Sequence, residues 1–482
     1  MHRLLAALTV VGCATCFAQP QPQQTIEDFI RVQSPVIALE HVRVIDGTGA
    51  PAQADQTIVI SSGKITVIGK AGVVSVPADA NRMDLSGYSA LPGLVGMHDH
   101  LYYPAGGGAG GELYHDMVFS FPRLYLAGGV TTIRTTGAVE PYADLELKKA
   151  IDAGKMIGPK INVTGPYLEG EGLPLIQVHK LTGPEDARRT VEYWAAEGAG
   201  SFKAYNYLTR AELKAAIDAA HRLGLTLTGH LCSVGFREAA ELGIDDLEHG
   251  LFVDTEFVPD KKPDVCPKPS YATAADMEIN GEPIQTTIRV LVAHHVAVTS
   301  TLPVIEDLNA DGPAPSKRVL DVMSEQARNT YLKERETTAT KSREKDTKLA
   351  QAIQRWRKMF GKEMEFERAF VKAGGLLLAG IDPIAGVIPG FADQREVELL
   401  VEAGFSPLEA IKIASLNGAQ FLKEDSRIGS LSAGKQADIM IVKGDPSTHI
   451  QDIENVDIVF KDGIGYDSQK LIESVKGQVG TR

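Results

Sequence analysis

The sequence has no excess of positive charge, and it lacks long apolar segments after its N-terminal region. Its 482 residues include 49 Lys and Arg against 62 Asp and Glu, which gives a net charge of −13. This balance argues against a general nucleic-acid-binding protein, because such proteins carry an excess of basic residues. No segment beyond the N-terminus has the length and hydrophobicity of a membrane span. No internal repeat is found. The composition is that of an ordinary globular protein, and the expected partner is a small molecule.

The N-terminal residues have the features of an export signal. Arg3 precedes a short apolar run, which is followed by small residues and a segment rich in Gln and Pro. Cleavage after Ala18 would remove a leader of residues 1–18. Alternatively, the sequence VVGC ending at Cys13 resembles a bacterial lipobox and would leave this cysteine lipid-modified. The protein is therefore predicted to be exported, periplasmic or secreted, with membrane attachment only if Cys13 carries a lipid.

Cysteine is scarce. Cys13 and Cys16 lie in the leader region, so only Cys232 and Cys266 remain in the rest of the chain. Export permits a disulfide between them, but the sequence cannot place the two sulfur atoms within bonding distance. Both residues are therefore predicted to be free thiols.

Both ends of the remaining chain have the alternating pattern of β-strands. After a linker over residues 19–33, residues 34–91 contain short apolar runs and a Ser-Gly hairpin turn. Residues 426–470 have the same character and are followed by a tail over residues 471–482. We expect the two β-rich segments to form one small β-sandwich.

The central segment, residues 92–425, alternates apolar strands with helical stretches that end in glycine, as an α/β barrel requires. The predicted fold class is therefore α/β, a (β/α)8 TIM-type barrel with a small β-sandwich built from both chain ends. The eight expected strands are Leu94 to His98, Val130 to Thr135, Lys160 to Thr164, Ser201 to Ala204, Thr226 to His230, Asp245 to His249, Ala297 to Thr301 and Leu376 to Asp382.

A charged helical insertion, residues 316–373, separates the last two expected strands. One interpretation is a pair of solvated helices on the barrel rim. The other is a lid over the active-site mouth, because loops that follow barrel strands emerge on the catalytic face.

Residues with metal-binding chemistry stand where the expected strands end. His98 and His100 close one strand, and residues two apart in a strand point to the same side, so both imidazoles can share a metal. Alone, this pair is weak evidence. Because a barrel presents the carboxyl ends of its strands at one face, four residues that close other strands can converge on it. They are Lys203, His230, His249 and Asp382.

Lys203 lies in an apolar strand, where its ammonium group would be desolvated and would repel metal cations. A neutral amine could instead add carbon dioxide and form a carbamate. The two oxygens of a carbamate on Lys203 can bridge two divalent ions, which accept oxygen and imidazole ligands. A salt-bridged lysine on the barrel rim is the alternative interpretation.

The motifs LPGLVGMHDH, TGHLCS, DDLEHG, AGIDP and SLNGAQFLKEDSRIGSLSAGKQADIMIVKGDP, together with Lys203, resemble the metal-dependent amidohydrolase superfamily. The resemblance is to its imidazolonepropionase-like and Xaa-Pro dipeptidase-like branch, and it covers roughly Val36 to Tyr466. It implies two metal ions, zinc by preference. His98 and His100 would hold one ion, His230 and His249 the other, and carboxylated Lys203 would bridge them, while Asp382 would complete the site and shuttle protons.

The sequence departs from the family pattern at Gly96, where an aspartate usually stands two residues before the first histidine. Loss of that carboxylate would weaken the support of His98.

The resemblance implies hydrolysis of an amide-type C–N bond by a metal-bridged hydroxide, in a dipeptide, an N-acyl amino acid or a cyclic amide. Two alternatives are a mononuclear deaminase of the same superfamily, which needs no bridging lysine, and a non-catalytic exported barrel that binds a metal or ligand. The oligomeric state is left open.

Three further residues are candidates for substrate binding. Tyr167 and Tyr205 could each donate a hydrogen bond to a developing oxyanion, although both could equally be packing residues. His179 lies in a loop after an expected strand and could reach the substrate.

Overall fold

The computed structural model describes residues 24–104, 113–173, 175–268, 273–309, 312–343 and 348–480. The predictions for the leader and for Cys13 lie outside these ranges. Within them, no helix combines the length and hydrophobicity that a membrane crossing needs.

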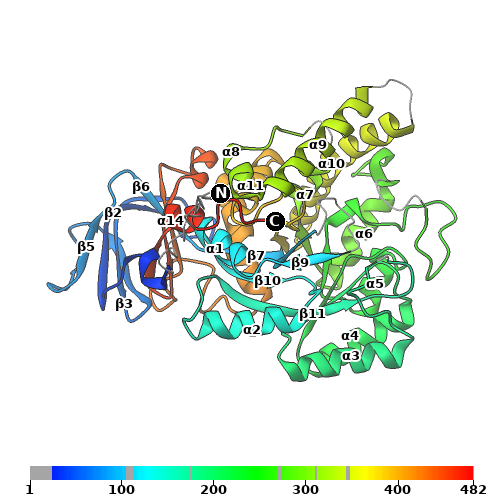
Figure 1. Cartoon of the computed structure of the whole chain (residues 1–482), viewed down its shortest axis with the longest axis horizontal. Helices are drawn as coiled ribbons and strands as arrows, with labels where there is room; N and C mark the ends of the chain where they lie inside the picture. The colour runs from blue at the N-terminus through cyan, green and yellow to red at the C-terminus, as the bar shows by residue number, and fades with distance from the viewer. Residues whose placement is uncertain are drawn as a thin grey trace, which may run out of the picture.

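Eight parallel strands form the barrel at the centre of the molecule (Figure 1). Each strand pairs with the next one along the chain, and the expectation of a (β/α)8 barrel is confirmed. The ring closes where the backbone N–H groups of Ile381 and Asp382 donate to the carbonyl of His98 at 3.1 and 2.9 Å. The strands are β7 (Leu94–Asp99), β10 (Val130–Thr135), β11 (Lys160–Leu168), β12 (Ser201–Ala204), β13 (Thr226–Gly229), β14 (Asp246–Glu248), β15 (Ala297–Ser300) and β16 (Leu377–Ala379).

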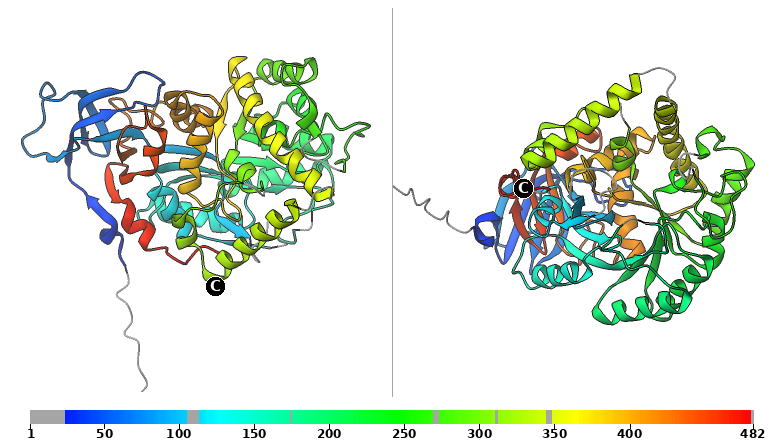
Figure 2. Two further views of the ribbon diagram at one scale, coloured as in Figure 1. Left: turned by 90° about the horizontal axis from the view of Figure 1, so that it is seen from above. Right: turned by 45° about the vertical axis from the view of Figure 1, so that its right-hand side comes forward.

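Helices follow the strands and surround them (Figure 2). Helix α4 shows why these segments are helical: Thr209 and Glu212 form a capping box, and Leu213, Ala216 and Ile217 bury one face. The helices that connect the strands include α1 (Ser120–Ala127), α2 (Pro141–Asp152), α3 (Pro184–Glu197), α4 (Arg210–Arg222), α5 (Phe236–Leu242), α6 (Glu282–Ala293), α7 (Leu302–Asp307), α11 (Phe391–Glu402) and α12 (Pro407–Lys412).

The two β-rich ends of the chain meet in one nine-stranded sheet beside the barrel. They join where β6 runs antiparallel to β17, with Leu91 opposite Met440. Ile37, Ile58 and Phe460 belong to the apolar core that both ends share. The strands are β1 (Ile30–Val32), β2 (Val36–Val44), β3 (Gln53–Ser61), β4 (Lys64–Lys70), β5 (Asn81–Asp84), β6 (Tyr88–Pro92), β17 (Ile439–Lys443), β18 (Val456–Lys461) and β19 (Ile464–Asp467).

The described residues of the insertion form the helices α8 (Lys317–Val322), α9 (Glu325–Arg343) and α10 (Lys348–Lys372). Helix α10 packs along the barrel, because Met359, Phe366 and Phe370 of one face are completely buried. This helix is therefore an integral part of the core, whereas α9 is largely exposed.

Cys232 and Cys266 form a disulfide, so the prediction of two free thiols is wrong. Their Cα atoms lie 4.8 Å apart, although 34 positions separate the two residues in the sequence. Cys232 lies shortly after the end of β13, and Cys266 belongs to the long connection between β14 and α6. The fold returns this connection to the end of β13, which no local sequence pattern could indicate.

Removing this disulfide is expected to destabilise the protein. A bridge that closes a loop of this length restricts the unfolded chain, and its loss costs about 2–4 kcal/mol of unfolding free energy. Urea unfolding of a Cys232→Ser/Cys266→Ser variant, compared with the oxidised parent, measures this loss. The parent treated with a reductant serves as the control and should unfold like the variant. Equal unfolding midpoints for variant and oxidised parent would contradict the expectation.

Candidate active site

The structure brings the six predicted site residues together at the carboxyl ends of the barrel strands. The ring centroids of His98 and His249 are 4.5 Å apart, and those of His230 and His249 are 4.6 Å apart. The Nζ atom of Lys203 lies 3.0 Å from Nε2 of His98. Residues that are far apart in the sequence thus share one small volume.

The carboxylate of Asp382 lies between the histidines. Its Oδ1 atom is 3.4 Å from Nε2 of His100 and 3.8 Å from Nε2 of His98, and its Oδ2 atom is 3.8 Å from Nε2 of His249. Burial by itself raises the pKa of Asp382, but the nearby His98, His100 and His249 hold it well below its usual range. The aspartate is therefore a carboxylate at neutral pH.

Two of the site residues have left-handed backbone conformations. The φ angles of His249 and Asp382 are 64° and 51°, in a region that residues with a side chain seldom adopt. Such strain persists only where the surrounding structure enforces it, and it is found preferentially at functional sites.

Three of the histidines point the same ring nitrogen toward the centre. Nδ1–H of His98 donates to Glu248 at 2.7 Å, and Nδ1–H of His100 donates to the carbonyl of Gly137 at 3.2 Å. Nδ1 of His249 is 2.7 Å from the hydroxyl of Thr301. Each Nε2 atom is thereby left to face the centre, which is the arrangement typical of metal-binding histidines.

The chemistry of these donors fits divalent metal ions. Burial lowers the pKa of His98, His100, His230 and His249, so the imidazoles are neutral, as metal ligands must be. Nε2 of His249 is buried without a hydrogen-bond partner, although it faces the other donors. Ligand atoms of His98, His249 and Asp382 all lie within 4.8 Å of one another. Burial also lowers the pKa of Lys203 to about 8, so that a larger fraction of its amine is neutral at pH 7 than in an ordinary lysine.

A network of buried charged residues holds the Nδ1 side of His98, and it was not predicted from the sequence. Arg134 on β10 donates to Asp246 at 2.6 Å and to Glu248 at 3.0 Å. The hydroxyl of Thr228 donates to Glu248 as well. The available signal was an arginine in the apolar strand VTTIRT, because a buried guanidinium requires a carboxylate partner.

Gly96 has a steric explanation. A Cβ atom at this position would lie 1.8 Å from Oδ2 of Asp99, whose buried carboxylate occupies the space beside it. The weakened support of His98 that the sequence suggested does not follow, because Glu248 holds the ring of His98.

Neutralising Glu248 is expected to weaken metal binding. A glutamine at this position keeps the size but loses the charge that strengthens the hydrogen bond from His98, and such changes cost about 10- to 100-fold in metal affinity. Titration of the metal-free protein with zinc in the presence of a competing chelator measures the effect in Glu248→Gln. Glu192→Gln on the surface of α3 is the matched control. Equal zinc affinity in the two variants would show that Glu248 does not support the site.

A cavity of about 310 Å³ opens at the site and is lined by four of the six residues, Lys203, His230, His249 and Asp382. Four tyrosines line the cavity. Tyr167 and Tyr205 are the candidates named from the sequence, and Tyr102 and Tyr114 were not predicted. The hydroxyl of Tyr167 is 3.5 Å from Nε2 of His100 and is hydrogen-bonded to the hydroxyl of Tyr102. Burial raises the pKa of Tyr167, so its hydroxyl keeps its proton and can donate.

The structure does not bring His179, the third predicted substrate-binding residue, into this cavity. Its imidazole is largely exposed and lies 2.9 Å from Oδ2 of Asp186, in the first turn of α3. The loop after β11 carries Leu173 and Leu175 into the cavity wall and then turns His179 away toward this helix.

Comparisons with known proteins agree with this geometry. Residues 89–465 match the amidohydrolase family. Among curated proteins, 111 residues are 39% identical to a dihydroorotase of Syntrophus aciditrophicus (strain SB), and 46 residues are 46% identical to adenine deaminase 4 of Rhizobium meliloti (strain 1021). These matches cover 22% and 10% of this chain, and the chain spans only 24% and 8% of the lengths of those two relatives.

Solved structures are similar over most of the chain. A candidate prolidase from Bifidobacterium longum is 25% identical with a TM-score of 0.65, over 91% of this chain and 98% of its own. A Xaa-Pro dipeptidase with bound methionine is 22% identical with a TM-score of 0.66, over 90% of this chain and 100% of its own. The ochratoxinase of A. niger is 18% identical with a TM-score of 0.64, over 90% of this chain and 96% of its own. Because the family match spans the barrel and the C-terminal β-rich segment, well over half of the chain, this chain belongs to the amidohydrolase family.

Proposed function

We propose that the protein is an exported, binuclear metal-dependent hydrolase that cleaves an amide-type C–N bond in a small molecule, such as a dipeptide, an N-acyl amino acid or a cyclic amide. Membership of the amidohydrolase family supports a metal-dependent hydrolase of C–N bonds. The observation that carries the finer proposal is the convergence of the His98, His100 and His249 Nε2 atoms on the carboxylate of Asp382, with Lys203 in contact.

Two bound divalent ions would lower the pKa of water and polarise the carbonyl of the substrate. The residues that would hold them are His98 and His100 for one ion and His230 and His249 for the other. The outward hydrogen bonds of Nδ1 fix the orientation of three of these rings before any ion arrives.

Lys203 would join the two halves of the site. Its amine lies among the histidines, and only one percent of the residue is exposed. As a carbamate, formed by addition of carbon dioxide to the neutral amine, it would carry a negative charge and offer one oxygen to each ion. This role favours a binuclear hydrolase over a mononuclear deaminase, which has no use for a bridging lysine.

Asp382 would move the proton. As a carboxylate it can accept a proton from the attacking water, and as an acid it can return that proton to the leaving nitrogen, so that the amine departs neutral. The hydroxyl of Tyr167, beside His100, is placed to donate a hydrogen bond to the oxygen of the reacting carbonyl. One water is consumed, the C–N bond breaks, and an acid and an amine are formed.

The disulfide supports the export that we propose. Disulfides persist in oxidising compartments and are rare in the reducing cytosol. The Cys232–Cys266 bridge is therefore compatible with a periplasmic or secreted enzyme.

Metal content and product analysis test the proposal together. The purified protein should hold two divalent ions per chain by elemental analysis, and it should release an amine and an acid from a mixed set of dipeptides and other amides. One ion per chain with release of ammonia from an aminated heterocycle would favour the deaminase. Two ions without turnover of any amide would favour a non-catalytic binding protein.

A further inference from the structure

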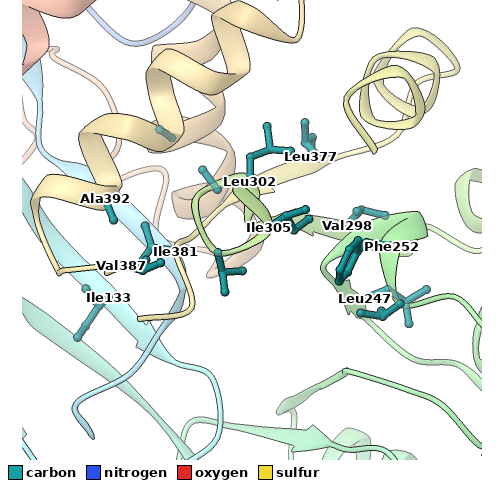
Figure 3. Close-up of a cluster of buried hydrophobic side chains, with 14 of the residues drawn as sticks. Ile133, Leu247, Phe252, Val298, Leu302, Ile305, Leu377, Ile381, Val387 and Ala392 are labelled. Atoms are coloured by element: carbon teal, nitrogen blue, oxygen red, sulfur yellow. The ribbon is translucent and has the colours of Figure 1, made fainter. Parts of the chain in front are cut away.

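The cavity in front of the candidate metal centre has walls that are almost entirely apolar or aromatic. Beyond the four tyrosines, its walls come from several separate elements of the barrel. Representative residues are Leu175, Phe252, Val304, Ile305, Trp356 and Ile384. Figure 3 shows Phe252 and Ile305 in the same buried apolar cluster, although they belong to different connections of the barrel.

Charge is confined to the innermost part of this cavity. Among the described residues that line it, the only acidic or basic side chains are Lys203, Asp382 and the two histidines of the candidate metal centre, His230 and His249. A carboxylate or ammonium group of a ligand placed against these walls would lose its hydration without gaining a partner of opposite charge. An uncharged apolar group meets no such penalty and gains from burial.

The insertion builds one of these walls. Trp356 on α10 lines the cavity, and its ring meets that of Phe252 edge to face, with the centroids 4.8 Å apart. Sequence alone left the insertion as either a rim cover or a lid. In the structure its helix α10 contributes directly to the surface that a bound substrate would touch.

A carboxylate of the same helix fixes the position of this wall. Glu363, two turns beyond Trp356, is completely buried and accepts a hydrogen bond of 2.6 Å from the backbone N–H of Phe252. Gly250 lies so close to Glu363 that a Cβ atom there would be 1.9 Å from its Oε1 atom. Helix α10 is thus attached to the segment that follows His249, and the aromatic wall and the metal centre have a fixed separation.

We propose that this cavity binds an uncharged, ring-sized apolar group next to the scissile bond of an amide substrate, and that Trp356 is the residue that selects for it. The inference rests on the proposed function and narrows it. Neutral aryl or alkyl amides would be preferred, and substrates that carry a carboxylate on this group, as free dipeptides do, would be disfavoured. Hydrolysis adds one water across the C–N bond and yields an acid and an amine.

A pair of compounds that differ in one charge tests this inference. 4-Methylacetanilide and 4-acetamidobenzoate share one amide bond and one ring, and they differ only by a methyl group against a carboxylate. Calorimetric titration of the metal-loaded enzyme should give a dissociation constant about 10-fold or more lower for the neutral compound, the scale on which apolar pockets discriminate. Equal or tighter binding of the carboxylate, or binding of neither compound, would overturn the proposal.

Three variants assign the selectivity to this wall. Trp356→Ala should weaken binding of the neutral compound about 10-fold, because the lost ring contact is not replaced. Leu308→Arg places a cation on the partly exposed cavity edge and should shift the preference toward the carboxylate. Leu332→Arg, on α9 outside the cavity lining and with the same 38% exposure as Leu308, is the control and should keep the parent preference. An unchanged preference in both Trp356→Ala and Leu308→Arg would contradict the proposal.

The same compounds separate this inference from the proposed function. Selective binding of the neutral compound without release of its aniline would leave the cavity assignment intact and count against the hydrolase. Efficient hydrolysis of free dipeptides, with weak binding of the neutral compound, would support the hydrolase and reject the apolar substrate class.

Discussion

Lys203→Ala should lose most of its bound metal and nearly all of its activity. The amine of Lys203 is buried among the histidines, 3.0 Å from His98, and as an uncharged or positively charged group it cannot bridge two cations. Only a carbamate on this nitrogen reverses the charge. Alanine removes the bridge and leaves two ions to repel each other, so the variant should hold clearly fewer than two ions per chain by elemental analysis.

Chemical rescue makes this expectation specific. A short carboxylic acid, such as propionate, can occupy the space that the side chain vacates and should restore part of both the metal content and the activity. Lys203→Arg should not respond, because a guanidinium stays charged and does not add carbon dioxide in this way. In the parent protein, metal-free enzyme should recover activity faster when bicarbonate accompanies the added metal. Two ions per chain and full activity in Lys203→Ala would contradict the carbamate bridge.

Asp382→Asn should keep much of the metal but lose turnover by about two to four orders of magnitude, the range typical of a general acid and base. Asparagine preserves the shape of the side chain, but it cannot hold the proton that passes from water to the leaving nitrogen. The measurement is kcat with the substrate identified in the screen, normalised to the metal content of each preparation.

Metal content distinguishes a proton-transfer defect from a binding defect in this variant. If Asp382→Asn retains its ions and its kcat falls, the aspartate acts on protons. If its kcat per bound metal equals that of the parent, the assignment of Asp382 is wrong. Asp445→Asn, in the C-terminal connection between β17 and β18 and far in sequence from the site, is a suitable control for the loss of one carboxylate.

The barrel and its six candidate ligands could be predicted from sequence because each signal is local. The strand expected to end in His98 is a continuous apolar run, and the same is true of the strand expected to end in Asp382. One topological rule then suffices, since all strands of a parallel barrel present their carboxyl ends at one face. The structure brings these residues together accordingly.

The remaining features depend on contacts that no short pattern contains. The Cys232–Cys266 bridge requires the long connection after β14 to return to the end of β13. The partnership of His98 with Glu248 joins two strands that are not neighbours in the barrel, β7 and β14. The approach of Trp356 to Phe252 depends on how α10 packs. The position of His179 outside the cavity is likewise not readable from the sequence, because its ring contacts Asp186 of α3.

The seam between β16 and β7 also determines when the site can exist during folding. The N–H groups of Ile381 and Asp382 bind the carbonyl of His98, so the first and last candidate ligands meet only when the two ends of the barrel sheet join. Contacts between such distant parts of a chain are costly in loop entropy and form late. On the proposed assignment, metal ions would bind only to chains that have completed this step, and each bound ion would slow the reopening of the ring. The rate at which the refolding protein takes up metal would therefore measure the rate of barrel closure.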